Sequence, residues 1–131
     1  MKPLRVVLDT NILVSALLSP LGNPAKVYKM FFAGSLVPVY SKDIMTEYTD
    51  VLYRPRLCIP TEDVDMVLNV IRLYGKRVEP ITSTFPMTDE DDRIFYDAAR
   101  SADAYLITGN TRHYPKESFI LIPTEFLALL R

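Results

Sequence analysis

Short apolar segments alternate along the chain with longer segments in which apolar residues recur every three or four positions. The short segments are rich in β-branched residues and predict strands, whereas the longer segments have the period of an amphipathic helix. In the segment before Gly75, for example, Val64, Val67, Leu68 and Ile71 follow helical spacing. The pattern predicts strands at residues 5–8, 37–40, 77–80, 105–108 and 119–122, and helices at residues 12–18, 25–33, 42–53, 61–74 and 88–100 and from residue 124.

The order of these elements predicts the fold class. Apolar strands without alternation are typical of strands buried on both faces, and strands that alternate with helices form parallel sheets. We therefore expect an α/β fold, a three-layer α/β/α sandwich around a mostly parallel sheet of about five strands. The chain has 131 residues, and its sequence has no repeat and no flexible linker. A single domain over residues 1–131 is therefore expected.

Composition narrows the class of protein. Hydrophobic residues make up 49% and charged residues 24% of the chain, which is ordinary for a globular domain and excludes disorder. Cys58 is the one cysteine, so no disulfide forms within the chain, and a reducing compartment fits. No apolar run approaches the roughly 20 residues that span a bilayer, so we expect a cytoplasmic protein with no membrane partner. The net charge of −1 does not by itself indicate a nucleic-acid partner.

Polar residues follow two of the predicted strands. In parallel sheets, ligands bind beyond the carboxyl ends of the strands. Asp9 and Asn11 come directly after the first strand, and Asn110 follows the fourth. Each position also has a structural explanation, because Asp9 or Thr10 could cap the next helix and Asn110 could be an ordinary turn residue.

Two further carboxylates lie on helices, toward the side that faces the core. Glu47 lies on or beside the apolar stripe of its helix, where a carboxylate is costly unless it is paired or metal-bound. The alternative is a rim glutamate that pairs with a lysine or arginine. Asp92 has apolar residues three, four and seven positions after it and therefore points along the packed face. Asp89 and Glu90 are expected to complement the helix dipole, after Thr88 as the N-cap.

If the fold brings Asp9, Glu47 and Asp92 together, three negative charges lie close to one another. Raised pKa values or a bound divalent cation make such a cluster tolerable. Ligation by oxygen alone favours Mg²⁺ or Mn²⁺ over zinc, and two such ions suit phosphodiester hydrolysis. Other chemistries lack their residues, since there is no glycine-rich phosphate loop and no nucleophilic serine motif. We expect His113 to be a surface loop residue and Cys58 to be an incidental thiol.

Four blocks of the sequence resemble the PIN domain, a family of metal-dependent nucleases. They follow in order across nearly the whole chain. The branch most similar in appearance contains the VapC-like toxin components of bacterial and archaeal toxin–antitoxin pairs. The blocks are residues 6–16, 41–56, 89–99 and 102–110.

The resemblance implies a parallel α/β/α sandwich whose acidic residues hold Mg²⁺ or Mn²⁺ for the hydrolysis of RNA. The matching positions for the catalytic, metal-binding carboxylates are Asp9, Glu47 and Asp92. Asn11 and Ser41 match polar positions that support the site. The fourth metal position is often aspartate in this branch but is Asn110 here, a neutral and weaker ligand, and Asp91 is an alternative ligand.

The resemblance also implies protein partners, namely a small antitoxin and a second copy of the chain in a homodimer. Two apolar segments are candidates for such interfaces, with ordinary core as the alternative for both. One is the helix around Val27, Met30, Phe31 and Phe32, and the other covers residues 66–73.

Two hypotheses about function therefore stand. The first is a metal-dependent endoribonuclease that hydrolyses RNA, as the toxin component of a toxin–antitoxin pair. The competing hypothesis is a catalytically weak or inactive PIN-like module that binds nucleic acid or protein, which the neutral Asn110 and the net charge favour. Only the first predicts metal-dependent hydrolysis that requires Asp9.

Overall fold

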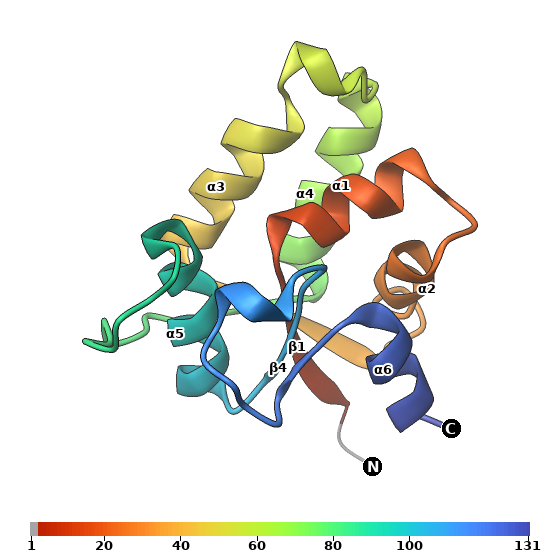
Figure 1. Cartoon of the computed structure of the whole chain (residues 1–131). Coiled ribbons are helices and arrows are strands. Elements are labelled where there is room, and N and C mark those ends of the chain that lie inside the picture. Colours follow the sequence, from red (N-terminus) through yellow and green to blue (C-terminus); the bar gives the residue numbers. More distant parts are fainter. Residues whose placement is uncertain (1–2) are drawn as a thin grey trace.

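The computed structural model describes residues 3–131. A five-stranded sheet forms its centre, in the order β3-β2-β1-β4-β5, and every pairing in it is parallel (Figure 1). All five strands overlap the predicted segments, which confirms the α/β fold class. The strands are β1 (Leu4–Leu8), β2 (Leu36–Tyr40), β3 (Lys76–Arg77), β4 (Tyr105–Ile107) and β5 (Ile120–Leu121).

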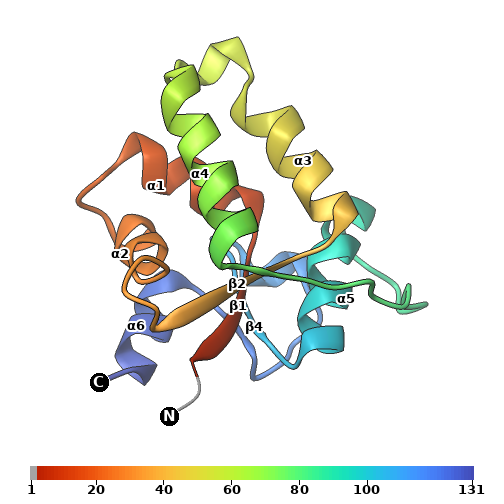
Figure 2. The same ribbon diagram turned by 180° about the vertical axis from the view of Figure 1, so that it is seen from behind.

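Helices cover both faces of this sheet, as predicted. In the described part of the chain the α-helices are α1 (Thr10–Leu18), α2 (Asn23–Lys29), α3 (Lys42–Leu52), α4 (Thr61–Tyr74), α5 (Arg93–Ala102) and α6 (Pro123–Leu129). Helix α5 lies on one side of the central strands, and α2 and α6 lie on the other (Figures 1 and 2). Helix α1 contacts α2, and α3 contacts both α4 and α5. No helix within residues 3–131 combines the length and the apolar character that crossing a membrane requires.

The core is centred on β1, the middle strand of the sheet. Val6 pairs with Pro38 of β2 on one side and with Tyr105 of β4 on the other. Val6 and Val7 point to opposite faces and are both fully buried. Burial on both faces explains why the strands have no alternation of apolar and polar residues.

Helix α2 is shorter than predicted. The apolar pattern predicted a helix to residue 33, but α2 ends at Lys29. Beyond it, backbone bonds such as Phe32 N–H to the Lys29 carbonyl span three residues instead of four, so the chain continues in tight turns. These turns lead to Gly34, whose φ of 74° lies in the left-handed region that glycine adopts at no steric cost.

The start of α5 also differs from the prediction. Thr88 is not the N-cap, because α5 begins at Arg93 after a 3₁₀ turn over Glu90–Asp92. The side chain of Asp89 caps this turn by accepting a hydrogen bond from the Asp91 amide at 3.0 Å. The short side chain of an aspartate can accept from the amide two residues further along the chain, and this bond stabilises the tight turn.

The last helix, which was predicted from residue 124 with Thr124 as its cap, also begins differently. Helix α6 starts one residue earlier, at Pro123, whose fixed φ suits the first helical position. The Glu125 carboxylate accepts from the Ile122 amide at 3.0 Å and thereby satisfies the helix start.

Candidate metal centre

The carboxyl ends of β1 and β4 bring Asp9 and Thr108 together. Asp9 follows Leu8, the last residue of β1, and its amide donates to the Ile107 carbonyl at 2.9 Å. Its side chain is buried, at 8% exposure. The Asp9 Oδ2 atom accepts hydrogen bonds from the Thr108 hydroxyl at 2.9 Å and the Tyr114 hydroxyl at 2.8 Å. Asp9 precedes α1, but its side chain makes no capping bond. The strand ends, and not helix capping, therefore position this carboxylate.

Two buried tyrosines line the same position. The Tyr48 hydroxyl of α3 donates to the Leu8 carbonyl at 2.5 Å, and Tyr114 donates to Asp9. Burial, and then the negative charge of Asp9, raise the pKa of both tyrosines well above the usual range. Both hydroxyls therefore stay protonated at neutral pH and act as fixed donors. Sequence reasoning missed Tyr114, because it lies in an irregular segment with no periodic signal.

Asp92 carries a buried carboxylate oxygen that lacks a hydrogen-bond partner. Its side chain is 15% exposed, and the oxygen without a partner is Oδ2. Nδ1 of His113 lies 3.4 Å from this oxygen, an ion-pair distance when the imidazole is protonated. The pKa of Asp92 is raised to about 6, chiefly by burial and then by the charges of Asp9 and Asp89, while His113 acts in the opposite direction. Such a carboxylate is stabilised by a cation.

Glu47 lies half-buried on α3. Burial raises its pKa, and the charges of Asp50, Asp91 and Asp9 raise it further, while Arg54 lowers it. Within residues 3–131, no ion pair and no side-chain hydrogen bond involves this carboxylate. The structure therefore differs from the alternative explanation, in which Glu47 pairs with a lysine or arginine at the rim. Glu47 and Asp92 each experience the charge of Asp9, which is the smallest of the influences on Glu47. In the part of the chain that the structure describes, the ligand atoms of Asp9, Glu47 and Asp92 do not all lie within 4.8 Å of one another.

The predicted supporting residues have structural roles at the same edge. Asn11 Oδ1 accepts from the Gly109 amide at 3.3 Å and links the end of β1 to the end of β4. Ser41 is buried and caps α3 by accepting from the Ile44 amide at 3.1 Å. Asn110 is exposed at this edge. Its Oδ1 accepts from the Arg112 amide, and its Nδ2 lies 3.0 Å from Nε2 of His113.

Asp92 also belongs to a second group of side chains that could bind a metal ion, which was not expected from the sequence. One ligand atom each from Asp89, Asp92 and His113 lies within 4.8 Å of the other two. Asp89 does cap a turn, in line with a structural role, but it also contributes its charge to this group. His113 was expected to be a surface loop residue, and its side chain is 44% exposed. Its position beside Asp92 follows from the fold of residues 109–114, which no local pattern indicates.

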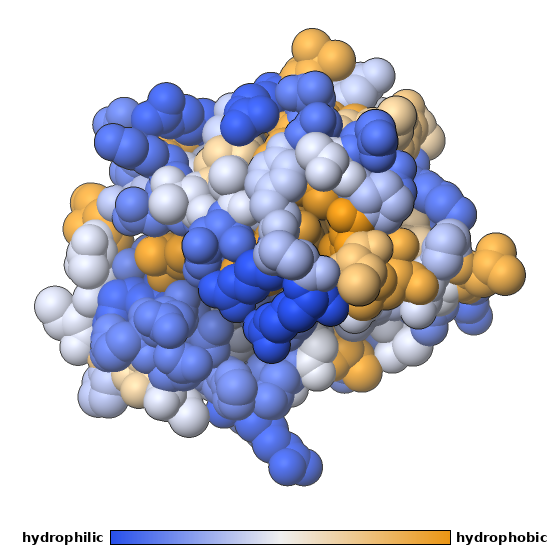
Figure 3. Space-filling model, turned by 90° about the horizontal axis from the view of Figure 1, so that it is seen from above, coloured by the Kyte–Doolittle hydropathy of each residue, from blue (hydrophilic) through white to orange (hydrophobic). Residues whose placement is uncertain are grey.

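The surface around the site is polar and hollowed. Figure 3 looks down on the side of the molecule that carries α1, α3 and α4, where hydrophilic side chains predominate on the side of α5 and apolar ones gather toward α2. A pocket of about 510 Å³ lies beside the strand ends, with Asn11, Gly109 and Asn110 in its wall. The pocket extends from these residues toward the starts of α2 and α6, and Asp9, Glu47 and Asp92 do not line it.

The raised pKa of Asp92 gives a prediction for the metal-free protein. Between its ordinary value of 3.8 and about 6, the folded chain binds more protons at this group than the unfolded chain does. The stability that this proton binding contributes is therefore lost as pH rises through that window, and it stays lost above it. We expect the melting temperature of Asp92→Asn relative to wild type to rise between pH 4 and pH 7, as measured by thermal unfolding in EDTA. A constant difference across this range would contradict the prediction.

Known proteins are similar to this chain in sequence and in fold. An uncharacterized protein of Methanocaldococcus jannaschii, MJ1680, is 29% identical over 110 residues, which are 82% of this chain and 71% of that protein. The solved structure of PAE2754 from Pyrobaculum aerophilum is similar with a TM-score of 0.59 at 14% identity, over 97% of this chain and 89% of that one. The structure of VapBC2 from Rickettsia felis bound to a DNA fragment from their promoter is similar with a TM-score of 0.57, also at 14% identity, over 91% and 97%.

The two solved structures show that the fold is shared. A match at the level of sequence shows the family as well. A model of the PIN domain family matches residues 5–112, from β1 to the turn that carries His113. This range includes Asp9, Glu47, Asp92 and Asn110. The chain therefore belongs to the PIN domain family.

Proposed function

We propose that this protein is a Mg²⁺- or Mn²⁺-dependent endoribonuclease whose cation is held by Asp9, Glu47 and Asp92. The observation that carries the proposal is the buried Asp92 Oδ2 atom, which has no hydrogen-bond partner and experiences the charge of Asp9. Such a buried carboxylate is costly unless a cation compensates it. Membership of the PIN domain family, whose proteins are generally metal-dependent nucleases, supports the same conclusion.

The donor set fits a hard divalent cation. The three side chains offer carboxylate oxygens alone, which Mg²⁺ and Mn²⁺ prefer. Asn110 adds no negative charge, and its amide is already engaged with Arg112 and His113, so it takes the role of a supporting residue in the proposed site. When bound, the cation supplies electrostatic stabilisation of the phosphodiester and lowers the pKa of a bound water.

The other residues of the site orient the carboxylates. Thr108 and Tyr114 hold Asp9 Oδ2 with two hydrogen bonds, so the carboxylate is fixed before any ligand arrives. Tyr48 ties α3, the helix that carries Glu47, to the end of β1 through the Leu8 carbonyl. This arrangement keeps the charged oxygens at the strand ends, where a phosphodiester can approach from solvent.

We further propose that the substrate is RNA and that the protein is a cytoplasmic toxin component with an antitoxin partner. The resemblance of the sequence blocks to the VapC-like branch supports this, as does the similarity of the fold to VapBC2. In the two segments that were candidates for the antitoxin contact and the homodimer, the large exposed apolar side chains are Phe32, Met66 and Leu73. Val27 and Phe31 are fully buried and belong to the core.

Wild-type protein is expected to cleave single-stranded RNA in the presence of Mn²⁺ or Mg²⁺ and to lose this activity in excess EDTA. The physical reason is that the carboxylates alone repel a phosphate, whereas a bound cation attracts it. Gel electrophoresis of a mixed, end-labelled RNA pool measures the cleavage. Readdition of Mn²⁺ after EDTA should restore it.

Absence of cleavage with every cation and RNA tested would instead favour the inactive binding module. The hydrogen bonds of the Asn110 amide to Arg112 and His113 would then explain the missing activity, because they already engage the amide and so weaken it as a ligand for a cation. Cleavage that persists in EDTA would contradict the metal-dependent mechanism.

A further inference from the structure

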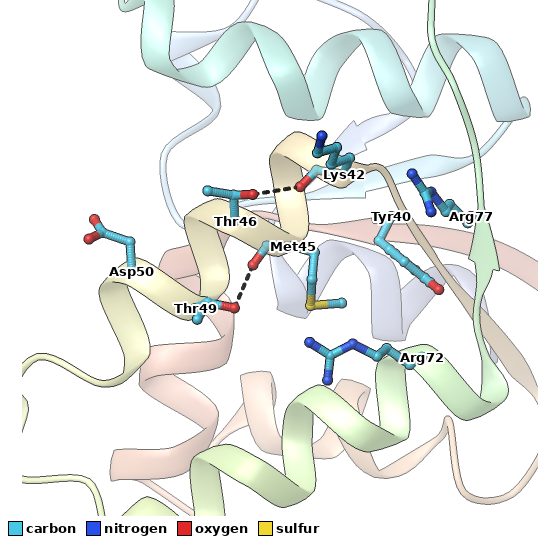
Figure 4. Close-up of a pocket in the computed structure, with 8 residues that line it drawn as sticks. All are labelled: Tyr40, Lys42, Met45, Thr46, Thr49, Asp50, Arg72 and Arg77. Atoms are coloured by element: carbon cyan, nitrogen blue, oxygen red, sulfur yellow. Dashed lines mark hydrogen bonds between the residues drawn. The ribbon is translucent and has the colours of Figure 1, made fainter.

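A basic pocket lies on α3, outside the carboxylate cluster. It has a volume of about 660 Å³ and is formed by α3, the end of α4, and strands β2 and β3. Figure 4 shows Arg72 from α4 and Arg77 from β3 on either side of Tyr40, with Lys42 at the start of α3. These side chains come from three separate segments of the sequence and meet only in the folded chain.

The pocket carries an excess of positive charge. Asp50 is its one acidic residue, and it forms an ion pair with Arg54 at 2.8 Å. Within residues 3–131, no ion pair and no side-chain hydrogen bond involves the cationic groups of Lys42, Arg72 or Arg77. Three like charges in one pocket repel one another, so an anion that binds among them is favourable.

The two threonine hydroxyls of the pocket already donate to backbone carbonyls. Thr46 donates to the Lys42 carbonyl at 3.0 Å, and Thr49 donates to the Met45 carbonyl at 2.8 Å, as the dashed lines in Figure 4 show. The donors left for an anion are therefore the cationic side chains and the Tyr40 hydroxyl. Arginine is suited to phosphate because its planar group can donate two parallel hydrogen bonds.

The pocket and the carboxylate cluster lie on adjoining faces of the same helix. Lys42, Met45, Thr46 and Thr49 share one face of α3, at helical spacing, and line the pocket. Glu47 follows Thr46 and therefore lies about 100° further around the helix. A strand of RNA that continues past the carboxylates would cross α3 and reach the pocket.

We propose that this basic pocket binds backbone phosphates of single-stranded RNA on one side of the bond that is cleaved. This inference rests on the proposed function and names a part of the chain that would hold the substrate. Arg72 and Arg77 would contact successive phosphates, and the half-buried Tyr40 between them offers a ring against which a base can stack. The excess charge favours a polyanion, and the three cations on separate elements suit an extended strand better than one small anion.

The test measures RNA binding without cleavage. Fluorescence anisotropy of a fluorescein-labelled 12-nucleotide oligouridine is recorded in EDTA for wild type and for the double variant Arg72→Gln/Arg77→Gln. We expect this variant to bind the RNA about tenfold more weakly than wild type at low salt. The slope of the logarithm of the binding constant against the logarithm of the salt concentration should be shallower by about 1.4, because two phosphate contacts are lost at roughly 0.7 each. The double variant Lys26→Gln/Arg56→Gln removes the same charge from exposed positions outside the pocket and should bind almost as wild type does.

Three outcomes would overturn the inference: no measurable RNA binding by the wild type, an equal loss in both double variants, or no loss in either. A further arm adds inorganic phosphate at matched ionic strength. Displacement of the RNA beyond the effect of chloride would assign the pocket to a small anion instead.

Cleavage assays with Mn²⁺ separate the two proposals. Pocket-dependent binding without cleavage refutes the proposed nuclease and retains the pocket, whereas normal cleavage and KM in the arginine variant refutes the pocket alone.

Discussion

Replacement of Asp9 by asparagine is expected to abolish metal-dependent RNA cleavage and to leave the fold intact. The substitution removes the buried negative charge at the strand ends but changes the shape of the side chain little. Its amide oxygen can still accept the hydrogen bonds that Thr108 and Tyr114 donate to Asp9 Oδ2. A bound cation supplies several kcal/mol of stabilisation, so we expect a loss of rate on the order of a thousandfold or more.

Asp103→Asn is the matched control for this experiment. Asp103 is exposed at the C-cap of α5, before β4 begins, and therefore lies at the opposite end of that strand from Asp9. Its φ of 53° is left-handed, a conformation that asparagine also adopts readily. Cleavage and thermal unfolding should both match the wild type in this variant. If Asp9→Asn cleaves RNA as fast as Asp103→Asn, the proposed role of Asp9 is wrong.

Replacement of Gly75 by alanine is expected to cause the largest loss of stability of any single methyl addition at a glycine. Gly75 follows α4 where the chain turns into β3, and an added Cβ would lie 2.7 Å from the Pro38 carbonyl and even closer to the Ile71 carbonyl. Both obstacles are backbone atoms of the central elements and cannot move aside cheaply. We expect a loss of about 3 kcal/mol. This corresponds to a drop in melting temperature on the order of 10 °C, measurable by circular dichroism.

Gly22→Ala provides the comparison. An added Cβ at Gly22 would lie 3.4 Å from its nearest neighbour, the Ser19 carbonyl, and the backbone there is extended, with φ of −79°. Only the weaker preference of alanine for the N-cap of α2 should be felt, about 1 kcal/mol or less. Similar melting temperatures for the two alanine variants would contradict the close approach of backbone at Gly75.

The fold could be predicted because its strongest signals are local. β4 and residues 6–8 of β1 are apolar throughout, and the spacing of apolar residues in α4 is regular, so the order of strands and helices could be predicted from the sequence. The errors occurred where hydrogen bonds, and not hydrophobic patterning, decide the structure. The end of α2 and the start of α5 depend on bonds between neighbouring residues, and many sequences can make such bonds in more than one way.

The candidate site could be predicted only in part, for a similar reason. The position of Asp9 followed from β1, because the end of a parallel strand is a fixed place in the fold. The contacts of Tyr114 with Asp9 and of His113 with Asp92 depend on the path of an irregular loop between β4 and β5. Tyr114 lies 105 positions after Asp9 in the sequence, and neither periodicity nor spacing contains the information that the two meet.

The basic pocket illustrates the same limit. Lys42, Arg72 and Arg77 belong to three elements, and each alone is an ordinary exposed basic residue in a chain of net charge −1. Strand β3 has only two residues, and its pairing with β2 places Arg77 opposite Tyr40. So short a strand carries almost no signal of its own, and the pocket appears only once the sheet is assembled.

The central claim is that the carboxylates of Asp9, Glu47 and Asp92 hold the divalent cation. Anomalous diffraction from crystals soaked in Mn²⁺ tests it most directly, because manganese scatters anomalously and its position is measured without reference to activity. We expect a peak within about 2.0–2.6 Å of oxygen atoms of Asp9 and Asp92, on the side of Glu47, and no such peak in Asp9→Asn. A peak held by Asp89, Asp92 and His113 without Asp9, or no ordered ion at millimolar Mn²⁺, would contradict it.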